Sequence, residues 1–386
     1  MNNIKISNVL NSLPLIFEKN IGQHDEKVQF ALNKKECTTF FNDNEIILSF
    51  RSNEKIQELK ELENSLILNE EDKKYSKYGI NILRVSFENG NKSPQIIGKN
   101  EFNCRLNYFK GENSLNWKCS IPLYEKLLYK EIYKGIDILY YESEGTIKWE
   151  FQVSSKKSLD KILLNFQGAN NIYLDEEGNI NINIKENILK ILNPRVTQED
   201  CSCEVTGNFE INEEGKVKFC IQNYENEKNL KITLPIVFEK FNYTFVVDRG
   251  NSIAVDENKC IYITGEIGVQ KYPNKKPHKN ILEAKDYSAF LVKIDSSKKG
   301  QSALKYAAYI GGEKNDEGVG IAVDDEENAY IVGSTNSEYE FPITEKSYAS
   351  NYPGGNSTGF LIKIDTSKVC LNSFISFFHF NVVFLN

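Results

Sequence analysis

The chain has 386 residues, and its 47 Lys and Arg against 54 Asp and Glu give a formal net charge of 47 − 54 = −7. At roughly 100–200 residues per domain, this length predicts about two domains, each large enough to bury a core. The mild acidity gives no electrostatic footprint for nucleic acid, so we predict no nucleic-acid partner. The 20 Tyr and 23 Phe, beside one Met and two Trp, favour half-buried strands over helix bundles.

The first residues, Met1-Asn-Asn-Ile-Lys5, show no basic start followed by an apolar stretch, so we expect no secretory signal here. Between residues 28 and 50, short apolar runs flank a cluster of Asn and Asp, which is typical of hairpins. Residues 52–76 break this pattern with a dense charge run whose apolar residues have helical spacing. We interpret residues 52–76 as a helical or mobile insertion.

Alternation of apolar and polar residues then continues to about residue 235. Residues 147–153 and 180–184 place apolar side chains at every second position, which predicts strands with one wet face. Asp175-Glu-Glu-Gly-Asn179 and Asn212-Glu-Glu-Gly215 have the length of hairpin loops, with Gly where a positive φ is needed. Short antiparallel strands with regular turns predict an all-β class and a sandwich-like domain over residues 1–235.

Beyond that point the sequence repeats itself. Asp248-Arg-Gly-Asn-Ser-Ile-Ala-Val-Asp256 returns as Asp316-Glu-Gly-Val-Gly-Ile-Ala-Val-Asp324, an offset of 324 − 256 = 68. Ala289-Phe-Leu-Val-Lys-Ile-Asp295 returns as Gly359-Phe-Leu-Ile-Lys-Ile-Asp365, an offset of 365 − 295 = 70. The strand-like runs of the fuller unit are 288–294, 302–310, 318–324 and 328–333. Four antiparallel strands per unit predict about two blades of an incomplete β-propeller over residues 236–368.

Four positions recur at equivalent places in the two units, namely Asp256, Gly265, Asp324 and Gly333. The aspartates end a strand before a turn, where a carboxylate can accept backbone N–H bonds, and the glycines close the next strand. We interpret all four as structural repeat positions. Because no Asp-x-Asp-x-Asp-Gly loop surrounds the aspartates, we do not predict calcium binding.

Several motifs, taken in order, resemble those of a known family. Leu13-Pro-Leu-Ile-Phe-Glu-Lys-Asn-Ile-Gly-Gln23, Asn107-Tyr-Phe-Lys-Gly111 and Tyr133-Lys-Gly-Ile-Asp-Ile-Leu-Tyr-Tyr141 resemble the N-terminal domain of bacterial SBBP (seven-bladed β-propeller) repeat proteins. Tyr309-Ile-Gly-Gly-Glu313 and Asn328-Ala-Tyr-Ile-Val-Gly-Ser334 are similar to that family's blade motif. The resemblance implies an N-terminal β domain followed by a propeller, in large exported or envelope-associated proteins. It supplies no catalytic residue.

Two units cannot close a ring that needs at least four blades, so we expect the open blade edges to allow self-association. Residues 369–386 are apolar and unlike anything upstream. Three interpretations of this tail stay open. As a membrane span it is marginal, because its 18 residues include three Asn and one His. It is otherwise a frame-shifted end of an interrupted gene, or a replacement strand in the place of the counterpart of Ser302–Ile310.

The eight cysteines show no repeated Cys-x-x-Cys spacing, which indicates neither a disulfide scaffold nor a zinc ribbon. We interpret most of them as buried thiols. With only three His in the chain, we predict no metal ion and no cofactor. His24, after Gly22-Gln23, is interpreted as a surface turn residue and not as a catalytic base.

Motifs for nucleophilic catalysis and phosphate binding are absent from the sequence. We therefore predict a non-enzymatic scaffold whose loops and sheet edges bind a protein or a glycan. One alternative is a carbohydrate-active enzyme with paired carboxylates, for which Glu142, Glu144 and Glu150 near Trp149 are the candidates. Another is a truncated gene product with no function of its own. The family resemblance suggests secretion or the cell envelope, whereas the sequence lacks an export signal, so the location stays open.

Overall fold

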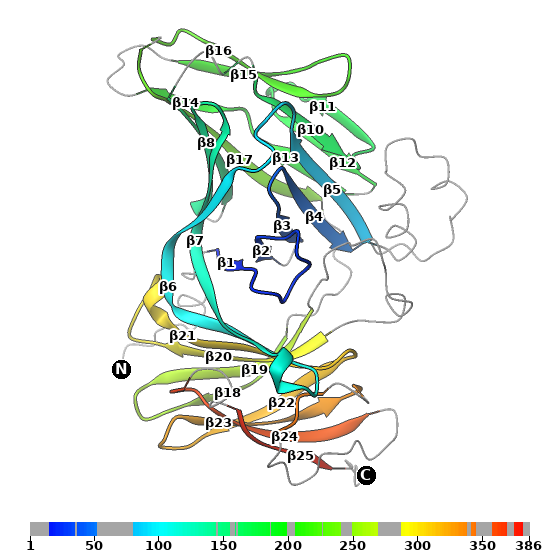
Figure 1. Cartoon of the computed structure of the whole chain (residues 1–386), viewed down its shortest axis with the longest axis vertical. Helices are drawn as coiled ribbons and strands as arrows, with labels where there is room; N and C mark the ends of the chain where they lie inside the picture. Colours follow the sequence, from blue (N-terminus) through cyan, green and yellow to red (C-terminus); the bar gives the residue numbers. More distant parts are fainter. Residues whose placement is uncertain are drawn as a thin grey trace, which may run out of the picture.

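Alternating apolar and polar residues make β-strands of nearly every described segment. The computed structural model describes residues 15–34, 37–51, 80–143, 146–154, 159, 161–185, 187–198, 205–225, 227–240, 249–268, 287–337, 341–344, 357–368 and 374–380. Figure 1 shows an N-terminal domain and, beside it, two stacked layers of strands from the C-terminal part of the chain. The predicted all-β class is confirmed. The insertion predicted at 52–76 lies outside the described residues.

The N-terminal domain is a nearly closed antiparallel sheet around one core. Its strands are β1 (Phe17–Lys19), β2 (Phe30–Asn33), β3 (Thr38–Phe41), β4 (Glu45–Arg51), β5 (Ile80–Phe87), β6 (Gln95–Lys110), β7 (Lys118–Tyr133), β8 (Ile136–Ser143), β9 (Thr146–Val153), β10 (Leu163–Gln167), β11 (Asn171–Leu174), β12 (Ile180–Ile184), β13 (Asn187–Ile191), β14 (Arg195–Gln198), β15 (Thr206–Ile211), β16 (Val217–Gln222) and β17 (Leu230–Lys240). Pairing runs from β15 through β16, β10, β5, β4, β3, β2, β1, β7, β8 and β9 to β17. β14 pairs with β17 and contacts β15, which nearly closes the circuit.

The predicted hairpins of this domain are confirmed. β11, β12 and β13 form consecutive antiparallel pairs, as do β15 and β16. The turn glycines Gly178 and Gly215 have φ values of +79° and +75°, a backbone conformation that glycine adopts at no steric cost. In β9 the buried side chains alternate with half-exposed ones, so Trp149 and Phe151 lie in the core.

The C-terminal part forms two four-stranded antiparallel sheets, here called the first and second blades. The first blade contains β18 (Arg249–Val255), β19 (Cys260–Gly268), β20 (Tyr287–Asp295) and β21 (Leu304–Gly311), and the second contains β22 (Asp316–Val323), β23 (Asn328–Thr335), β24 (Thr358–Asp365) and β25 (Phe374–Phe380). Tyr262 lies opposite Lys293 in the first blade, as Tyr330 lies opposite Lys363 in the second. The two sheets therefore share one register.

The repeat unit chosen from the sequence is out of phase with the blades. Its runs at 288–294 and 302–310 complete the first blade, whereas those at 318–324 and 328–333 open the second. Sequence repetition gives a period but not a starting point, so the frame of the blade has to come from strand pairing. The limits predicted for the three domains stay a prediction.

The tail takes the place of the missing outer strand. β25 pairs with β24 so that Phe380 lies opposite Gly359, just as Ile310 of β21 lies opposite Ala289. Both partners are offset by 70, since 359 − 289 = 70 and 380 − 310 = 70, and the register shift falls at the same step in both blades. This is the place that the strand interpretation gave to the tail, while the origin of its sequence stays untested. In the described part of the chain, no helix is long and apolar enough to cross a membrane.

A long hairpin joins the N-terminal domain to the blades. In Figure 1, β6 and β7 run from the upper part of the molecule to the blades, with the 3-10 turn η1 (Ser114–Asn116) at their tip. β6 adds to the outer strand β21 in parallel, with Leu106 opposite Ala307. Near the tip, Phe109 and Trp117 enter the apolar core between the blades. The two parts of the chain thus share both a sheet and a core.

The cysteines are only in part the buried thiols expected from the sequence. Cys37, Cys104 and Cys260 are buried and carry reduced thiols, as does the half-buried Cys220. Cys119, at the start of β7, is instead disulfide-bonded. Scattered spacing could not reveal this bond, because a disulfide depends on distance in the fold and not along the chain.

The recurrent glycines stand where two strands approach too closely for a side chain. A Cβ on Gly265 would lie 1.7 Å from the carbonyl oxygen of Arg249, and one on Gly333 would lie 2.0 Å from that of Glu317. Both positions adjoin the β-bulge between the first two strands of a blade. The close approach therefore explains why the same glycine recurs in both units.

We predict that Gly265→Ala lowers the free energy of unfolding by about 3 kcal/mol, because the bulge must open to admit the methyl group. Urea denaturation measures the loss. Gly250→Ala is the matched control, since Gly250 lies opposite Gly265 and its Cβ would stand 3.4 Å from Ile263. Equal losses in both variants would refute this explanation.

Candidate functional site

The two blades pack face to face. From the first blade, Tyr262, Ala289 and Leu291 are buried in the shared core, and Ile331 and Phe360 come from the second. Alternate residues of a strand point to opposite faces, so each blade has apolar side chains on both sides. One blade can therefore stack on the next, as in a β-propeller.

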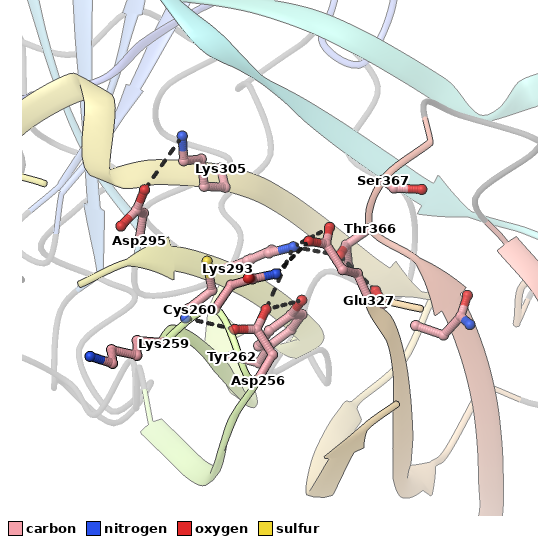
Figure 2. Close-up of polar contacts among 12 residues, drawn as sticks. Asp256, Lys259, Cys260, Tyr262, Lys293, Asp295, Lys305, Glu327, Thr366 and Ser367 are labelled. Carbon is pink, nitrogen blue, oxygen red and sulfur yellow. Dashed lines mark hydrogen bonds and ion pairs between the residues drawn. The ribbon is translucent and has the colours of Figure 1, made fainter. Parts of the chain in front are cut away.

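A polar cluster lies at one end of this apolar contact. We call it the interblade cluster and define it as Asp256, Tyr262, Lys293, Glu327 and Thr366 (Figure 2). The Lys293 ammonium donates to Glu327 Oε2 at 2.7 Å and to Thr366 Oγ1 at 3.3 Å, both from the second blade. From its own blade, Lys293 Nζ lies 4.0 Å from Asp256 Oδ2 and 5.0 Å from the centre of the Tyr262 ring.

One ammonium group faces two carboxylates in the cluster. The side chains of Lys293 and Asp256 are only 5% and 6% exposed. Burial acts to lower the pKa of Lys293, but the hydrogen bonds with Glu327 and Tyr262 outweigh it and hold that pKa above its ordinary value. Lys293 is consequently a charged ammonium that pairs with carboxylates, and not a neutral amine available as a nucleophile.

Tight turns position the carboxylates. Asp256 directly follows β18, accepts the backbone N–H of Cys260 at 2.8 Å and accepts a hydrogen bond from the Tyr262 hydroxyl at 3.1 Å. In the second blade, Asp324 likewise accepts the backbone N–H of Asn328 at 2.9 Å. Both recurrent aspartates therefore fix the turn between the first two strands of a blade.

The second blade repeats half of the cluster. Lys363 Nζ lies 5.1 Å from the centre of the Tyr330 ring and 3.8 Å from Asp324 Oδ2, and Tyr330 donates to that oxygen at 3.0 Å. We call these three residues the outer triad. Its Lys363 and Asp324 side chains are 24% and 31% exposed. Burial acts to raise the pKa of Asp324, but hydrogen bonds from Asn328 and Tyr330 hold it at about 2.

A buried carboxylate holds the start of the second blade. Asp316 accepts hydrogen bonds from Thr335 Oγ1 at 2.5 Å, from the backbone N–H of Gly312 at 2.8 Å and from Ser337 Oγ at 3.3 Å. Burial raises its pKa to about 6, although the charge of Lys110 in β6 and these hydrogen bonds act to lower it. Asp316 is thus a titratable group at the junction of the hairpin and the second blade.

Trp149 and Glu150, two of the residues proposed for a glycosidase, lie on opposite faces of β9. Trp149 is buried in the N-terminal core, whereas Glu150 is the next residue of β9 and points to the opposite face. There Glu150 accepts the Tyr141 hydroxyl at 3.0 Å. Glu142 lies opposite Ile147 on β8, and Glu144 lies outside the described residues. Adjacent strand residues cannot share a face, so Trp149 cannot serve as a sugar platform beside Glu150.

His24 is not the surface turn residue expected from the sequence. Its side chain is 5% exposed, and Nε2 lies 2.5 Å from Oε1 of the buried Glu18. Tyr108 of β6 donates to the same carboxylate at 2.9 Å. The imidazole is therefore part of a buried contact between β1 and the long hairpin. Within the described ranges, no three His, Cys, Asp or Glu side chains gather closely enough to hold a metal ion.

Sequence reasoning placed Asp256 and Asp324 at recurrent positions but missed Lys293 and Glu327. A signal was present for Lys293, since a charged residue recurs between apolar neighbours in Val-Lys-Ile and Ile-Lys-Ile. No comparable signal marked Glu327, because the equivalent position of the first unit, 327 − 68 = 259, holds Lys259. The role of Glu327 can be seen only in the stacked blades, where it contacts Lys293 of the first blade.

We expect Lys293→Met and Glu327→Gln to show strong energetic coupling in a double-mutant cycle followed by urea denaturation. Lys293→Met alone should lower the free energy of unfolding by about 3 kcal/mol, since it leaves the buried carboxylate of Asp256 without its cation, and the coupling energy should be about 1–3 kcal/mol. The matched cycle of Lys363→Met and Asp324→Asn should give less than half that coupling, because Lys363 is 24% exposed against 5% for Lys293 and its Nζ lies 3.8 Å, not 2.7 Å, from the carboxylate. Similar coupling in the two cycles would contradict the burial argument.

Asp316 should make the stability of the chain depend on pH. Its pKa rises from 3.8 to about 6 on folding, so the folded state holds a proton that the unfolded state releases between these values. The stability that this bound proton contributes is complete below pH 3.8 and is lost as the pH rises through 6. The free energy of unfolding of Asp316→Asn, measured relative to wild type by denaturant melts, should therefore increase by about 3 kcal/mol between pH 4 and pH 7. A difference that does not change with pH would refute the shift.

Two family models match this chain. A model described as a domain of unknown function (DUF7948) covers residues 17–233, and one described as a β-propeller repeat (SBBP) covers residues 305–342. The resemblance stated from the sequence motifs is thereby confirmed. A search of curated proteins found no matching relative. Because the first model alone spans more than half of the residues, the chain belongs to the DUF7948 family and carries a β-propeller repeat after that domain.

Proposed function

We propose that this chain is a non-catalytic scaffold that binds a protein or a glycan, at the cell envelope or exterior, through the open face of its second blade. The observation that carries the proposal is the exposure of aliphatic side chains there. Val319 and Val332 are 52% and 40% exposed. The counterpart of Val332 in the first blade is Thr264, since 332 − 68 = 264, and Thr264 is fully buried. Exposed apolar surface on a rigid sheet is typical of an interaction site.

The aliphatic side chains of the second blade support a protein ligand. Val319 and Val332, both exposed in the described part of the chain, can pack against apolar side chains of a protein. The disulfide at Cys119 supports an oxidising location such as the envelope or the exterior. No observation favours the carbohydrate-active enzyme, because Trp149 and Glu150 lie on opposite faces of β9. The truncated-product interpretation stays a prediction about the gene.

The test compares how the purified chain is retained on the envelope fraction of the producing cell. We expect wild type to co-sediment with this fraction and Val332→Asp to lose about tenfold in apparent affinity, because a charge would enter the contact. Leu115→Asp is the matched control, since Leu115 is an exposed apolar residue at the hairpin tip. Equal retention of all three proteins, or none, would contradict the proposal. A glycan array probed with the same proteins separates glycan from protein ligands.

A further inference from the structure

We infer that the outer triad of the second blade is a receptor for a repeat unit that carries an acidic residue at the position of Glu327, and that Lys259 denies this place to a second copy of the chain. The inference rests on the proposed binding role and names its partner. It follows from comparing the two blades, because Lys293 of the first has a carboxylate from its neighbour, whereas the described residues supply none from a neighbouring blade to Lys363.

The outer triad matches the first-blade half of the interblade cluster. Asp324, Tyr330 and Lys363 correspond to Asp256, Tyr262 and Lys293 by the repeat offsets of 68, 68 and 70. Each tyrosine donates to its aspartate, at 3.1 Å in the first blade and 3.0 Å in the second, and each lysine lies over its tyrosine ring. The second blade thus holds the same three groups in the same arrangement.

The interblade cluster shows which groups of a neighbouring unit bind to such a triad. Lys293 donates hydrogen bonds to a carboxylate oxygen of Glu327 and to the hydroxyl oxygen of Thr366. Glu327 has a positive φ of 66°, in the turn after β22, and Thr366 donates to its backbone oxygen at 2.8 Å. The ligand expected on Lys363 is therefore the carboxylate of a turn residue held by a neighbouring hydroxyl. Val332 and Val319 beside the triad would be covered by the apolar face of the same unit.

The first blade presents the corresponding surface on its open side, but with the opposite charge. Lys259 has a positive φ of 64°, and Ser296 donates to its backbone oxygen at 2.8 Å, which repeats the turn of Glu327 and Thr366. Lys259 is exposed, and Figure 2 shows it pointing away from the interblade cluster. Ile253 and Val255, the counterparts of the interblade residues Ile321 and Val323, are also exposed on this side.

By the repeat correspondence, these two open surfaces match the faces that meet between the blades in apolar character but not in charge. If the first blade of one copy stacked on the second blade of another, Lys259 would face Lys363, and two ammonium groups would meet where the chain's own blades have a lysine and a glutamate. Like charges in a desolvated contact repel each other and suppress the wrong partner. Self-association, expected from the sequence because blades stand open, is thus disfavoured in its head-to-tail form.

The inference is tested by placing a carboxylate at residue 259 of the first blade, the position equivalent to Glu327. We expect purified Lys259→Glu to associate head to tail, with a mass in sedimentation velocity that rises over about 1–100 µM, while wild type keeps the mass of one chain. Lys259→Gln should associate at least about tenfold more weakly than Lys259→Glu, because it removes the repulsion without supplying a carboxylate. Lys259→Glu with Lys363→Glu should return to a single chain, since two carboxylates then meet.

The same variants exclude a trivial result. Residue 259 is exposed, so each variant should keep the thermal melting curve of wild type. A Lys259→Glu chain that stays at the mass of one copy, a wild type that associates as strongly, or a double variant that still associates would each overturn the inference. Retention on the envelope fraction is measured separately, so the proposed binding role can fail or stand independently of this outcome.

Discussion

The burial of one ammonium group between two sheets is the constraint on which the arrangement of the blades depends. Lys293 lies on a strand of the first blade, yet its closest carboxylate comes from the second. An uncompensated charge would be costly in such a contact, so the stacking of the blades and the pairing of Lys293 with Glu327 require each other. The apolar core supplies attraction without direction, and the ion pair fixes which turn meets which strand.

Most of the fold could be predicted from the sequence, because a period of two along a strand and a period near 70 along the chain are both visible without a structure. Strand alternation placed Trp149 and Phe151 on one face, and the repeat placed Asp256 on Asp324. Neither period reveals where one sheet ends and the next begins. The parallel pairing of Leu106 with Ala307 was equally hidden, because it joins segments about two hundred residues apart that share no pattern.

Only those residues of the site that recur in both repeat units could be predicted from the sequence. Asp256 and its counterpart stood out by repetition, whereas Glu327 differs from its counterpart and therefore looked like ordinary variation. The burial of His24 was missed for a related reason, since the Tyr108 ring that packs against its imidazole lies 84 residues further along the chain. By contrast, the separation of Trp149 from Glu150 follows from the pleat of a strand alone, so that candidate pair could have been rejected on the sequence.

The union of β6 with β21 also governs the order in which the molecule can be assembled. During synthesis the hairpin emerges long before β21, the blade strand with which β6 pairs. The aromatic rings of Phe109 and Trp117 therefore stay exposed to solvent until the blades form. Contacts so distant along the chain form late and slowly. The nascent N-terminal domain therefore passes through a stage in which the apolar rings at the hairpin tip are exposed and the hairpin still lacks its partner strand.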